Sequence, residues 1–321
     1  MFQKLLLDKI QEDLQAKSLN EEIAKVLDIS YDAAHRRTSL KSKISLDEAM
    51  LLAHYFDLSL DSLTGEAYSG YVSMEKTPQL NNEEDLERYF RSSYESLSII
   101  VNNIGFQILY SAKDIPLFHL LRSGELSRFK IYVWLKLLDK SFRNKSFSEF
   151  YPKLSTIQSA SKLADIYNHI SVSEIWDVTT INSTLKQIHF YYKANQVTYE
   201  EAIDLCNCLK ELLDEISTKV VSKKQEFNLY YNELLLMNNN VLVFNESKQM
   251  LFVPSAMLSY FKITDKETCL EAKKYFDKQI KHSKLLNTSG EKEQNQFYNK
   301  VMQKIEALAQ LIKAENVLDF E

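Results

Sequence analysis

The segment from Glu21 to Arg37 limits the possible fold more than any other part of the chain, because its apolar residues fit two short helices joined by a tight turn. Ile23 and Leu27 lie four residues apart and would share the inner side of the first helix. Ala24 and Ala34 are small enough to let two helices cross closely, which larger side chains would prevent. The segment therefore predicts a compact helix-turn-helix unit.

The turn between these helices has its own signals. Ile29 would fill it from the inside, and Ser30 is a good N-cap for a second helix over Tyr31–Thr38. Asp28 stands where the backbone needs a left-handed conformation, which Asp tolerates better than most residues other than Gly. At the other end of the unit, Asn20 is the expected N-cap of the first helix.

Further helices are predicted on both sides of this pair. Residues 2–16 have apolar side chains spaced four apart, which is typical of an amphipathic helix. Ser45 is expected to cap a helix over residues 46–56, and residues 58–63 predict a last helical turn. The first 65 residues thus read as five helices in sequence.

This arrangement resembles the lambda-repressor and Cro-like (XRE) helix-turn-helix family, both in residues 21–37 and in residues 44–63, which look like that family's fourth and fifth helices. The chain departs from the family at Asp28, where Gly is usual. It departs again at residues 38–40, where many members have an acidic residue and a Gly. The resemblance implies a DNA-binding domain over residues 1–65.

The resemblance also implies that Tyr31–Thr38 is the recognition helix, with its N-terminal half on the bases in the major groove. Arg36 would contact guanine, Asp32 would accept from cytosine, and Tyr31 would contact a thymine methyl group or a phosphate. The expected base-reading residues are Tyr31, Asp32, His35 and Arg36. The expected phosphate-binding residues are Asn20, Ser30, Arg37, Thr38, Lys41 and Lys43. Four of these ten residues are Arg or Lys and one, Asp32, is acidic, so the local charge is positive although the whole chain carries a formal charge of -5.

The rest of the chain is predicted to be almost entirely helical. With only 5 Gly and 4 Pro in 321 residues, a fold with many tight turns is disfavoured. The expected helices cover residues 84–103, 126–142, 159–169, 180–194, 198–217, 223–237, 266–281 and 291–314. One β-hairpin is expected at residues 241–253, where two apolar runs flank a polar stretch. The fold class predicted from the sequence is therefore all-α, with a polar linker at residues 66–82 and a helical effector or dimerisation domain at residues 83–321.

Other classes of function find little support in the sequence. It contains no phosphate-binding glycine loop, no zinc-protease motif and no nucleophile elbow, so we expect no enzyme, no catalytic residue and no cofactor. The six histidines lack metal-ligand spacing, and the three cysteines are expected to be free thiols. No apolar run is long enough for a membrane span or a signal peptide, which indicates a cytoplasmic protein.

The sequence therefore predicts a DNA-binding transcription regulator that acts on double-stranded DNA as a homodimer. The apolar stripe of residues 291–314 fits either a dimer interface or a core helix. The closing part of the chain, for example Tyr230–Glu233 and Phe261–Asp265, also resembles poorly characterised helix-turn-helix regulators of bacteroidete type. This resemblance does not identify the small-molecule or peptide effector that such a regulator would bind. Two alternatives stay open: a protein-interaction scaffold, and a peptide-sensing regulator with a superhelical C-terminal domain.

Overall fold

A computed structural model of the chain divides it into two compact units, Met1–Met74 and Glu75–Glu321. It describes residues 2–14, 18–56, 58, 60, 63, 72–101, 105–122, 124–222, 226–234 and 238–318. The expected linker at residues 66–82 lies outside the described residues as far as residue 71. From Glu75 onwards its residues belong to the larger unit, where Leu80 is buried in the core.

The smaller unit is helical. It contains α1 (Phe2–Asp13), α2 (Leu19–Leu27), α3 (Tyr31–Thr38) and α4 (Leu46–Tyr55). Their apolar faces meet in a core around Ile10, Ile23, Ala34 and Leu52, each of which has no measurable exposure. Of the expected fifth helical turn at residues 58–63, residues 59, 61 and 62 lie outside the described residues.

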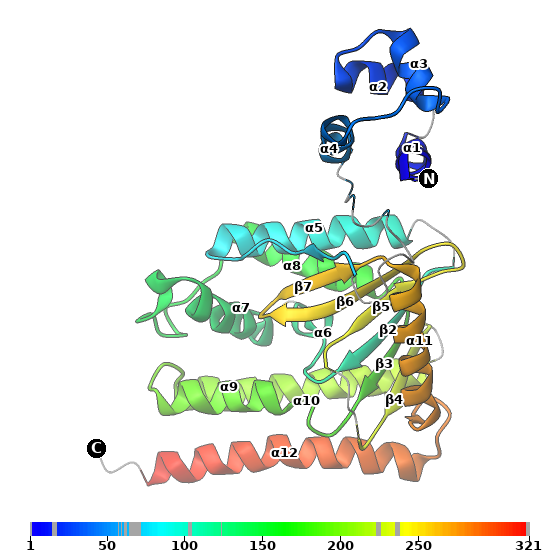
Figure 1. The fold of residues 1–321 in the computed structure, drawn as a ribbon. Helices are drawn as coiled ribbons and strands as arrows, with labels where there is room; N and C mark the ends of the chain where they lie inside the picture. The colour runs from blue at the N-terminus through cyan, green and yellow to red at the C-terminus, as the bar shows by residue number, and fades with distance from the viewer. Residues whose placement is uncertain are drawn as a thin grey trace. The chain divides into compact units, whose positions relative to one another are not determined.

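The larger unit overturns the all-α prediction, because it is built on an eight-stranded mixed sheet (Figure 1). The strands follow the order β1-β7-β6-β5-β2-β3-β4-β8 across the sheet. Their bounds are Glu75–Lys76 for β1, Gln107–Ala112 for β2, Ser171–Trp176 for β3, Phe227–Tyr231 for β4, Val241–Phe244 for β5, Gln249–Ala256 for β6, Ser259–Ile263 for β7 and Lys284–Leu285 for β8. The expected hairpin is present as β5 and β6, but it is one part of this sheet and not an isolated element.

Helices cover both faces of the sheet, so the larger unit is an α/β domain (Figure 1). Neighbouring residues of one strand face opposite sides: on β2, Ile108 and Tyr110 belong to the larger core and Leu109 to the smaller one. The smaller core contains Cys269 and Phe276 of α11 (Lys266–Lys281). The larger core is covered by α5 (Glu83–Val101), α6 (Leu117–Leu120), α7 (Glu125–Leu138), α8 (Leu154–Tyr167), α9 (Asn182–Lys193), α10 (Tyr199–Val221) and α12 (Glu291–Val317), with a short 3-10 helix, η3, at Lys140–Phe142.

Strands β2, β3 and β4 run parallel, and helices connect one to the next. This arrangement places their carboxyl ends, at Ala112, Trp176 and Tyr231, along one edge of the sheet. Open α/β sheets bind their ligands outside this edge. It is therefore the first place to look for a ligand site in the larger unit.

The predicted helix at residues 223–237 is wrong, because Phe227–Tyr231 is strand β4. Its residues alternate between buried and half-buried, which is the two-residue period of a strand. The low Gly and Pro content also misled the prediction, since polar side chains support the turns instead. In the turn between β5 and β6, for example, Asn245 Oδ1 accepts hydrogen bonds from the amides of Ser247 and Lys248 at 2.9 and 2.7 Å.

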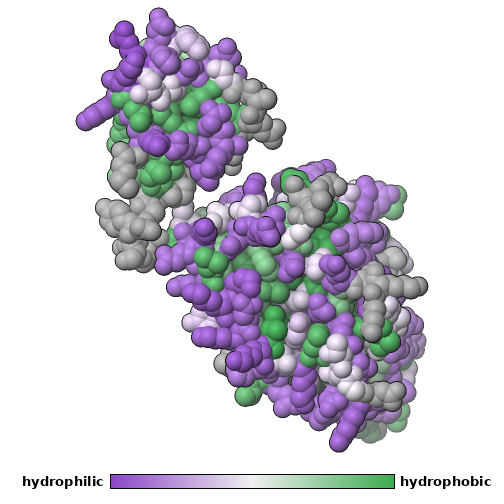
Figure 2. Space-filling model, turned by 90° about the vertical axis from the view of Figure 1, so that its right-hand side faces the viewer, coloured by the Kyte–Doolittle hydropathy of each residue, from purple (hydrophilic) through white to green (hydrophobic). Residues whose placement is uncertain are grey.

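The apolar stripe of α12 belongs to the core and does not form a dimer interface. Phe297, Val301, Ile305 and Ile312 have no measurable exposure, and Leu308 is 9% exposed. The side of the larger unit shown in Figure 2 is mainly hydrophilic, with hydrophobic side chains in narrow patches between charged ones. None of the described helices is long and apolar enough to cross a membrane.

Candidate DNA-binding surface

The turn between α2 and α3 has the backbone that the sequence predicted. Asp28 takes the left-handed conformation, with φ 52° and ψ 49°, and the next amide, Ile29 N, donates to Ala24 O at 3.0 Å. This conformation ends α2 and lets the chain turn directly into α3. A helix-turn-helix can thus form here without the usual Gly, at a modest cost in backbone strain.

Two serines begin helices in the smaller unit. Ser30 Oγ accepts a hydrogen bond from Ala33 N at 3.3 Å, which caps α3. Ser45 and Glu48 form a reciprocal capping box at the start of α4. Both caps are where the sequence predicted them, and the cap uses the Ser30 hydroxyl only as an acceptor, so its O–H can still donate to a ligand.

Asn20 does not cap α2, which begins at Leu19 after Ser18. Its side chain instead reaches across to α3. Asn20 Nδ2 donates to the Tyr31 hydroxyl at 3.2 Å, and Asn20 Oδ1 accepts from Thr38 Oγ1 at 2.5 Å. Asn20 and Thr38 therefore connect the two helices, and this connection fixes the position of the Tyr31 hydroxyl at the surface.

The four expected base-reading residues all lie on the exposed side of α3. Tyr31 is 53% exposed, and Asp32, His35 and Arg36 are also exposed. Positions 31, 32, 35 and 36 are one, three, four or five residues apart and so occupy one side of a helix. The structure thus brings a phenol, a carboxylate, an imidazole and a guanidinium together on one helix face, where each can contact a base edge.

Arg37 has a different role from the one that the sequence suggested. Its Nη2 lies 2.5 Å from Glu48 Oε1 and its Nε lies 3.2 Å from Glu48 Oε2, a two-pronged ion pair between α3 and α4. Arg37 Nη1 also donates to Ala33 O at 3.2 Å. The Arg37 guanidinium beside Glu48 lowers the pKa of that carboxyl. Arg37 therefore holds α3 in place against α4 more than it offers charge to a phosphate.

The loop after α3 presents the remaining charges. Lys41 and Lys43 are exposed there. Gln3 of α1 holds this loop: its Nε2 donates to Arg37 O at 2.9 Å and to Ser42 O at 2.8 Å, and its Oε1 accepts from Ile44 N at 3.1 Å. Sequence reasoning missed Gln3 and Glu48 as positioning residues, because each acts on a partner more than ten residues away in the chain.

The loop contains a second left-handed residue, Leu40, with φ 61°. It falls within residues 38–40, where the family resemblance showed a departure from an expected Gly. Two hydrogen bonds, from Leu40 N to Arg37 O and from Ser42 N to Arg36 O, keep the loop folded against the end of α3. These bonds hold Leu40 in a backbone conformation that Gly would adopt at lower cost.

The finished surface consists of the exposed side of α3 and the loop that follows it. Arg36, Lys41 and Lys43 give it positive charge, and Asp32 is the one acidic residue within Ser30–Lys43. Within the described part of the chain, no group of three or more His, Cys, Asp or Glu side chains is placed to hold a metal ion. The chain matches no protein-family model, no curated protein and no solved structure, so the surface is interpreted from its own residues.

Proposed function

We propose that this protein is a sequence-specific DNA-binding transcription regulator of the cytoplasm, in which α3 reads bases in the major groove. The observation that carries the proposal is the single exposed face formed by Tyr31, Asp32, His35 and Arg36 beside the basic loop residues Lys41 and Lys43. A two-helix unit with a capped, exposed second helix is the geometry that enters a major groove.

The residues on and around α3 would contribute to DNA binding in different ways. Tyr31, Asp32, His35 and Arg36 are the base readers, and Lys41 and Lys43 bind phosphates. Asn20, Thr38 and Arg37 position α3, since their side chains are engaged with neighbouring helices. Ser30 caps the helix through its hydroxyl oxygen, and it can still donate its O–H to a phosphate beside the helix N-terminus.

A regulator also needs a second function, and the larger α/β unit is the part that would supply it. We propose that this unit binds an effector or a second copy of the chain. Two copies would bring two recognition helices to half-sites about 34 Å apart, one turn of DNA. A superhelical peptide-binding domain is not carried forward, because the larger unit is built on an eight-stranded sheet.

The test is selection of bound sequences from a random duplex library by the full-length protein, followed by affinity measurements at several salt concentrations. Arg36→Ala should relax the preference at one base and cost about 1–3 kcal/mol on the selected site. Lys41→Ala should weaken binding to all sequences equally and reduce the salt slope by about 1. Lys9→Ala is the matched control, since Lys9 lies on α1 and pairs with Glu12 at 3.1 Å.

An inverted repeat among the selected sequences would support a dimeric reader. If the wild-type protein enriches no sequence at low salt, the proposal fails, and the alternative that the exposed face of α3 binds a protein partner becomes the next hypothesis to test. Equal losses in Arg36→Ala and Lys9→Ala would remove Arg36 from the set of base readers.

A further inference from the structure

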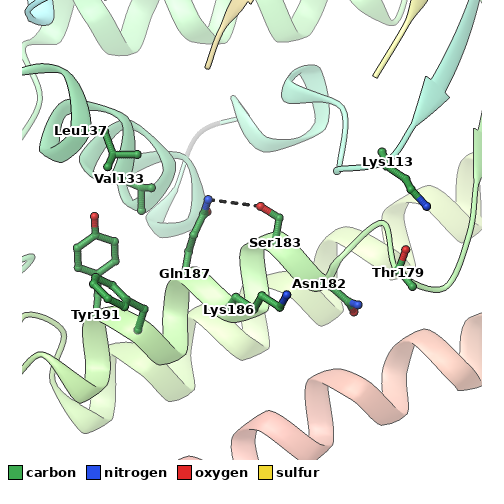
Figure 3. Close-up of a pocket in the computed structure, with 10 residues that line it drawn as sticks. Lys113, Val133, Leu137, Thr179, Asn182, Ser183, Lys186, Gln187 and Tyr191 are labelled. Carbon is green, nitrogen blue, oxygen red and sulfur yellow. Dashed lines mark hydrogen bonds between the residues drawn. The ribbon is translucent and has the colours of Figure 1, made fainter. Parts of the chain in front are cut away.

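The larger unit contains a surface cavity of about 630 Å³, widely open to solvent, between α7 and α9 and beside the carboxyl ends of β2 and β3 (Figure 3). Its position is the edge of the sheet where α/β folds bind small molecules. Its volume falls within the range of about 300–1,000 Å³ found for small-molecule sites. No residue that the sequence analysis selected lies in it.

One end of the cavity is polar. Lys113 follows β2, Thr179 follows β3, and Asn182, Ser183 and Lys186 come from the first turns of α9 (Figure 3). The residue before α9, Ile181, has no side-chain acceptor, so no side chain caps this helix. The Asn182 amide donates to Thr179 O at 2.9 Å, so only the amides that follow it in the first turn can serve a ligand. Amides and ammonium groups together favour a negatively charged ligand group at this end.

The other end of the cavity is apolar. Val133 and Leu137 of α7 lie opposite Tyr191 of α9 (Figure 3). Phe190 of α9 also lines the cavity. Leu137 is 66% exposed and Phe190 is 64% exposed, so both side chains leave apolar surface open to a ligand. A ligand that fills the whole cavity would therefore combine a charged group with an apolar body.

Positive charge exceeds negative charge around the polar end. Lys113 Nζ pairs with Asp177 Oδ2 at 3.2 Å, and Lys304 Nζ of α12 donates to Asn182 Oδ1 at 3.0 Å. Lys186 is exposed and has no ion-pair partner among the residues that the structure describes. Asp177 is already occupied: besides Lys113, it accepts from Thr179 N and Thr179 Oγ1 at 2.5 and 2.6 Å.

A fourth ammonium group lies behind the cavity. Lys130 of α7 is 2% exposed, and its Nζ donates to Gln187 Oε1 at 2.7 Å and to Thr184 Oγ1 at 3.4 Å. Both partners are neutral, so the charge of Lys130 has no carboxylate in contact. Gln187 in turn lines the cavity and donates to Ser183 Oγ at 3.5 Å (Figure 3). Burying an ammonium group without a carboxylate in contact costs stability, and an anion bound in the cavity would offset part of that cost.

We infer that this cavity binds a small organic anion, with its carboxylate or phosphate at Lys186, Ser183 and the start of α9, and with its apolar body between α7 and Phe190. Gln187 and Lys130 form the floor of the site. That the anion regulates DNA binding rests on the proposed function, whereas the binding itself does not.

Calorimetric titration of the full-length protein tests the inference, with phenyl phosphate, phenylacetate and benzyl alcohol as probes at constant ionic strength. At least one of the two anions should bind saturably and more tightly than benzyl alcohol, and the tighter of the two identifies the head group. Lys186→Gln should weaken binding of that anion about tenfold and leave benzyl alcohol unchanged, because one charge-assisted hydrogen bond is lost. Phe190→Ala should weaken the anions and the alcohol alike.

Lys162→Gln is the matched control, because Lys162 is an exposed lysine of α8 outside the cavity. Absence of saturable binding of both anions at millimolar concentration would overturn the inference. So would equal losses in Lys186→Gln and Lys162→Gln, or benzyl alcohol binding as tightly as the anions. These titrations contain no DNA, so failure of anion binding and failure of the DNA-binding proposal are observed separately.

Discussion

In the smaller unit the charged side chains of α3 lie at the surface or are half-buried. The described residues of the larger unit instead include five Asp, Glu, His or Lys side chains that are less than 7% exposed: Glu83, His119, Lys130, Glu174 and Asp177. A buried charge is tolerated only when hydrogen bonds or an opposite charge replace the water it has lost. The difference teaches where to look for ligands. A charged side chain at the surface of α3 can contact a binding partner directly. A charged side chain inside the larger unit can attract a ligand only if the residues around it supply no opposite charge.

Four of the five buried groups are well provided with partners. Glu83 Oε1 accepts from Lys153 N at 2.6 Å and from Thr156 Oγ1 at 3.1 Å, which connects α5 to α8. Asp177 holds the loop after β3. His119 and Glu174 are partners of each other, with Nε2 and Oε1 2.8 Å apart. Lys130 is the exception, because both of its hydrogen-bond partners, Thr184 and Gln187, are neutral.

The Glu174 carboxylate gives the largest expected effect. It has no measurable exposure, and besides His119 it accepts from the Tyr167 hydroxyl at 2.8 Å and from Trp176 Nε1 at 2.7 Å. Because a carboxylate can only accept, Nε2 of His119 must carry a proton in this pair. Burial and the nearby Glu174 charge raise the pKa of the Tyr167 hydroxyl, so it stays a donor.

Glu174→Leu should therefore lower the free energy of unfolding of the larger unit by about 3–5 kcal/mol, since three buried donors lose their acceptor. Urea unfolding followed by tryptophan fluorescence measures this change, because both tryptophans, Trp134 and Trp176, lie in the larger unit. Glu211→Leu, at an exposed position of α10, is the control and should change stability by less than about 0.5 kcal/mol. A loss in Glu174→Leu as small as that of the control would mean that water replaces the missing carboxylate.

The second prediction concerns the incompletely partnered Lys130. Lys130→Met should raise the free energy of unfolding at pH 7 by about 1–2 kcal/mol, because it removes a buried charge that has no carboxylate partner and keeps a similar volume. Burial lowers the pKa of the Lys130 ammonium below its usual 10.5. Between that lowered pKa and 10.5 the unfolded chain binds more protons than the folded one, so wild-type stability should rise with pH in this window.

The same urea titrations, repeated from pH 7 to pH 10, check both parts of this prediction. The free energy of unfolding should rise less with pH in Lys130→Met than in the wild-type protein, because the variant lacks the titrating Lys130 ammonium. Lys162→Met provides the comparison at an exposed lysine. Destabilisation by Lys130→Met at pH 7 would show that the hydrogen bonds to Gln187 and Thr184 outweigh the cost of burial, and the contrast between Lys130 and the other buried groups would disappear.

The smaller unit could be predicted closely from its sequence because its signals are local. Ser30 and Ser45 cap the helices that they precede, and Asp28 takes the left-handed backbone expected of it. Each of these features depends on residues within about four positions of one another. The Arg37–Glu48 pair could not be predicted, since it joins residues on two helices whose packing the sequence alone does not show.

The larger unit could not be predicted in the same way, because its sheet depends on pairing between distant residues. β2 pairs with β3 and with β5, across more than 60 and more than 130 residues. The central strands are short, apolar and buried on both sides, so they show little difference from segments of buried helix. Most of the predicted helices are present, and the 266–281 helix has the predicted bounds. The cavity was missed because its residues come from α7, α9 and two loops that only the sheet brings together.

The last prediction has the smallest expected effect and concerns the partly exposed ion pair between α3 and α4 of the smaller unit. Glu48→Gln should lower the local stability of α3 and α4 by about 1 kcal/mol, because the Arg37–Glu48 pair is about one-fifth exposed and water compensates for part of its loss. Hydrogen exchange of peptides covering residues 31–55 in the full-length protein measures the change at each helix. Tryptophan fluorescence should not change, since both tryptophans lie in the larger unit.

Glu48 both pairs with Arg37 and belongs to the capping box of α4. The pH dependence of hydrogen exchange separates the loss of the ion pair from the loss of the cap. The Glu48 pKa is lowered below 4.5 in the folded state, first by the hydrogen bond from Arg37 and also by bonds from Ser45. Its contribution is therefore fully present above pH 4.5 and is lost as the pH falls through the lowered value. Wild-type α3 and α4 should lose protection in that window, whereas Glu48→Gln should lack this loss. Glu12→Gln, which removes an exposed carboxylate on α1, should keep the wild-type profile. If Glu48→Gln and the wild-type protein lose protection in parallel, Arg37 is held by its bond to Ala33 O and not by the charge of Glu48.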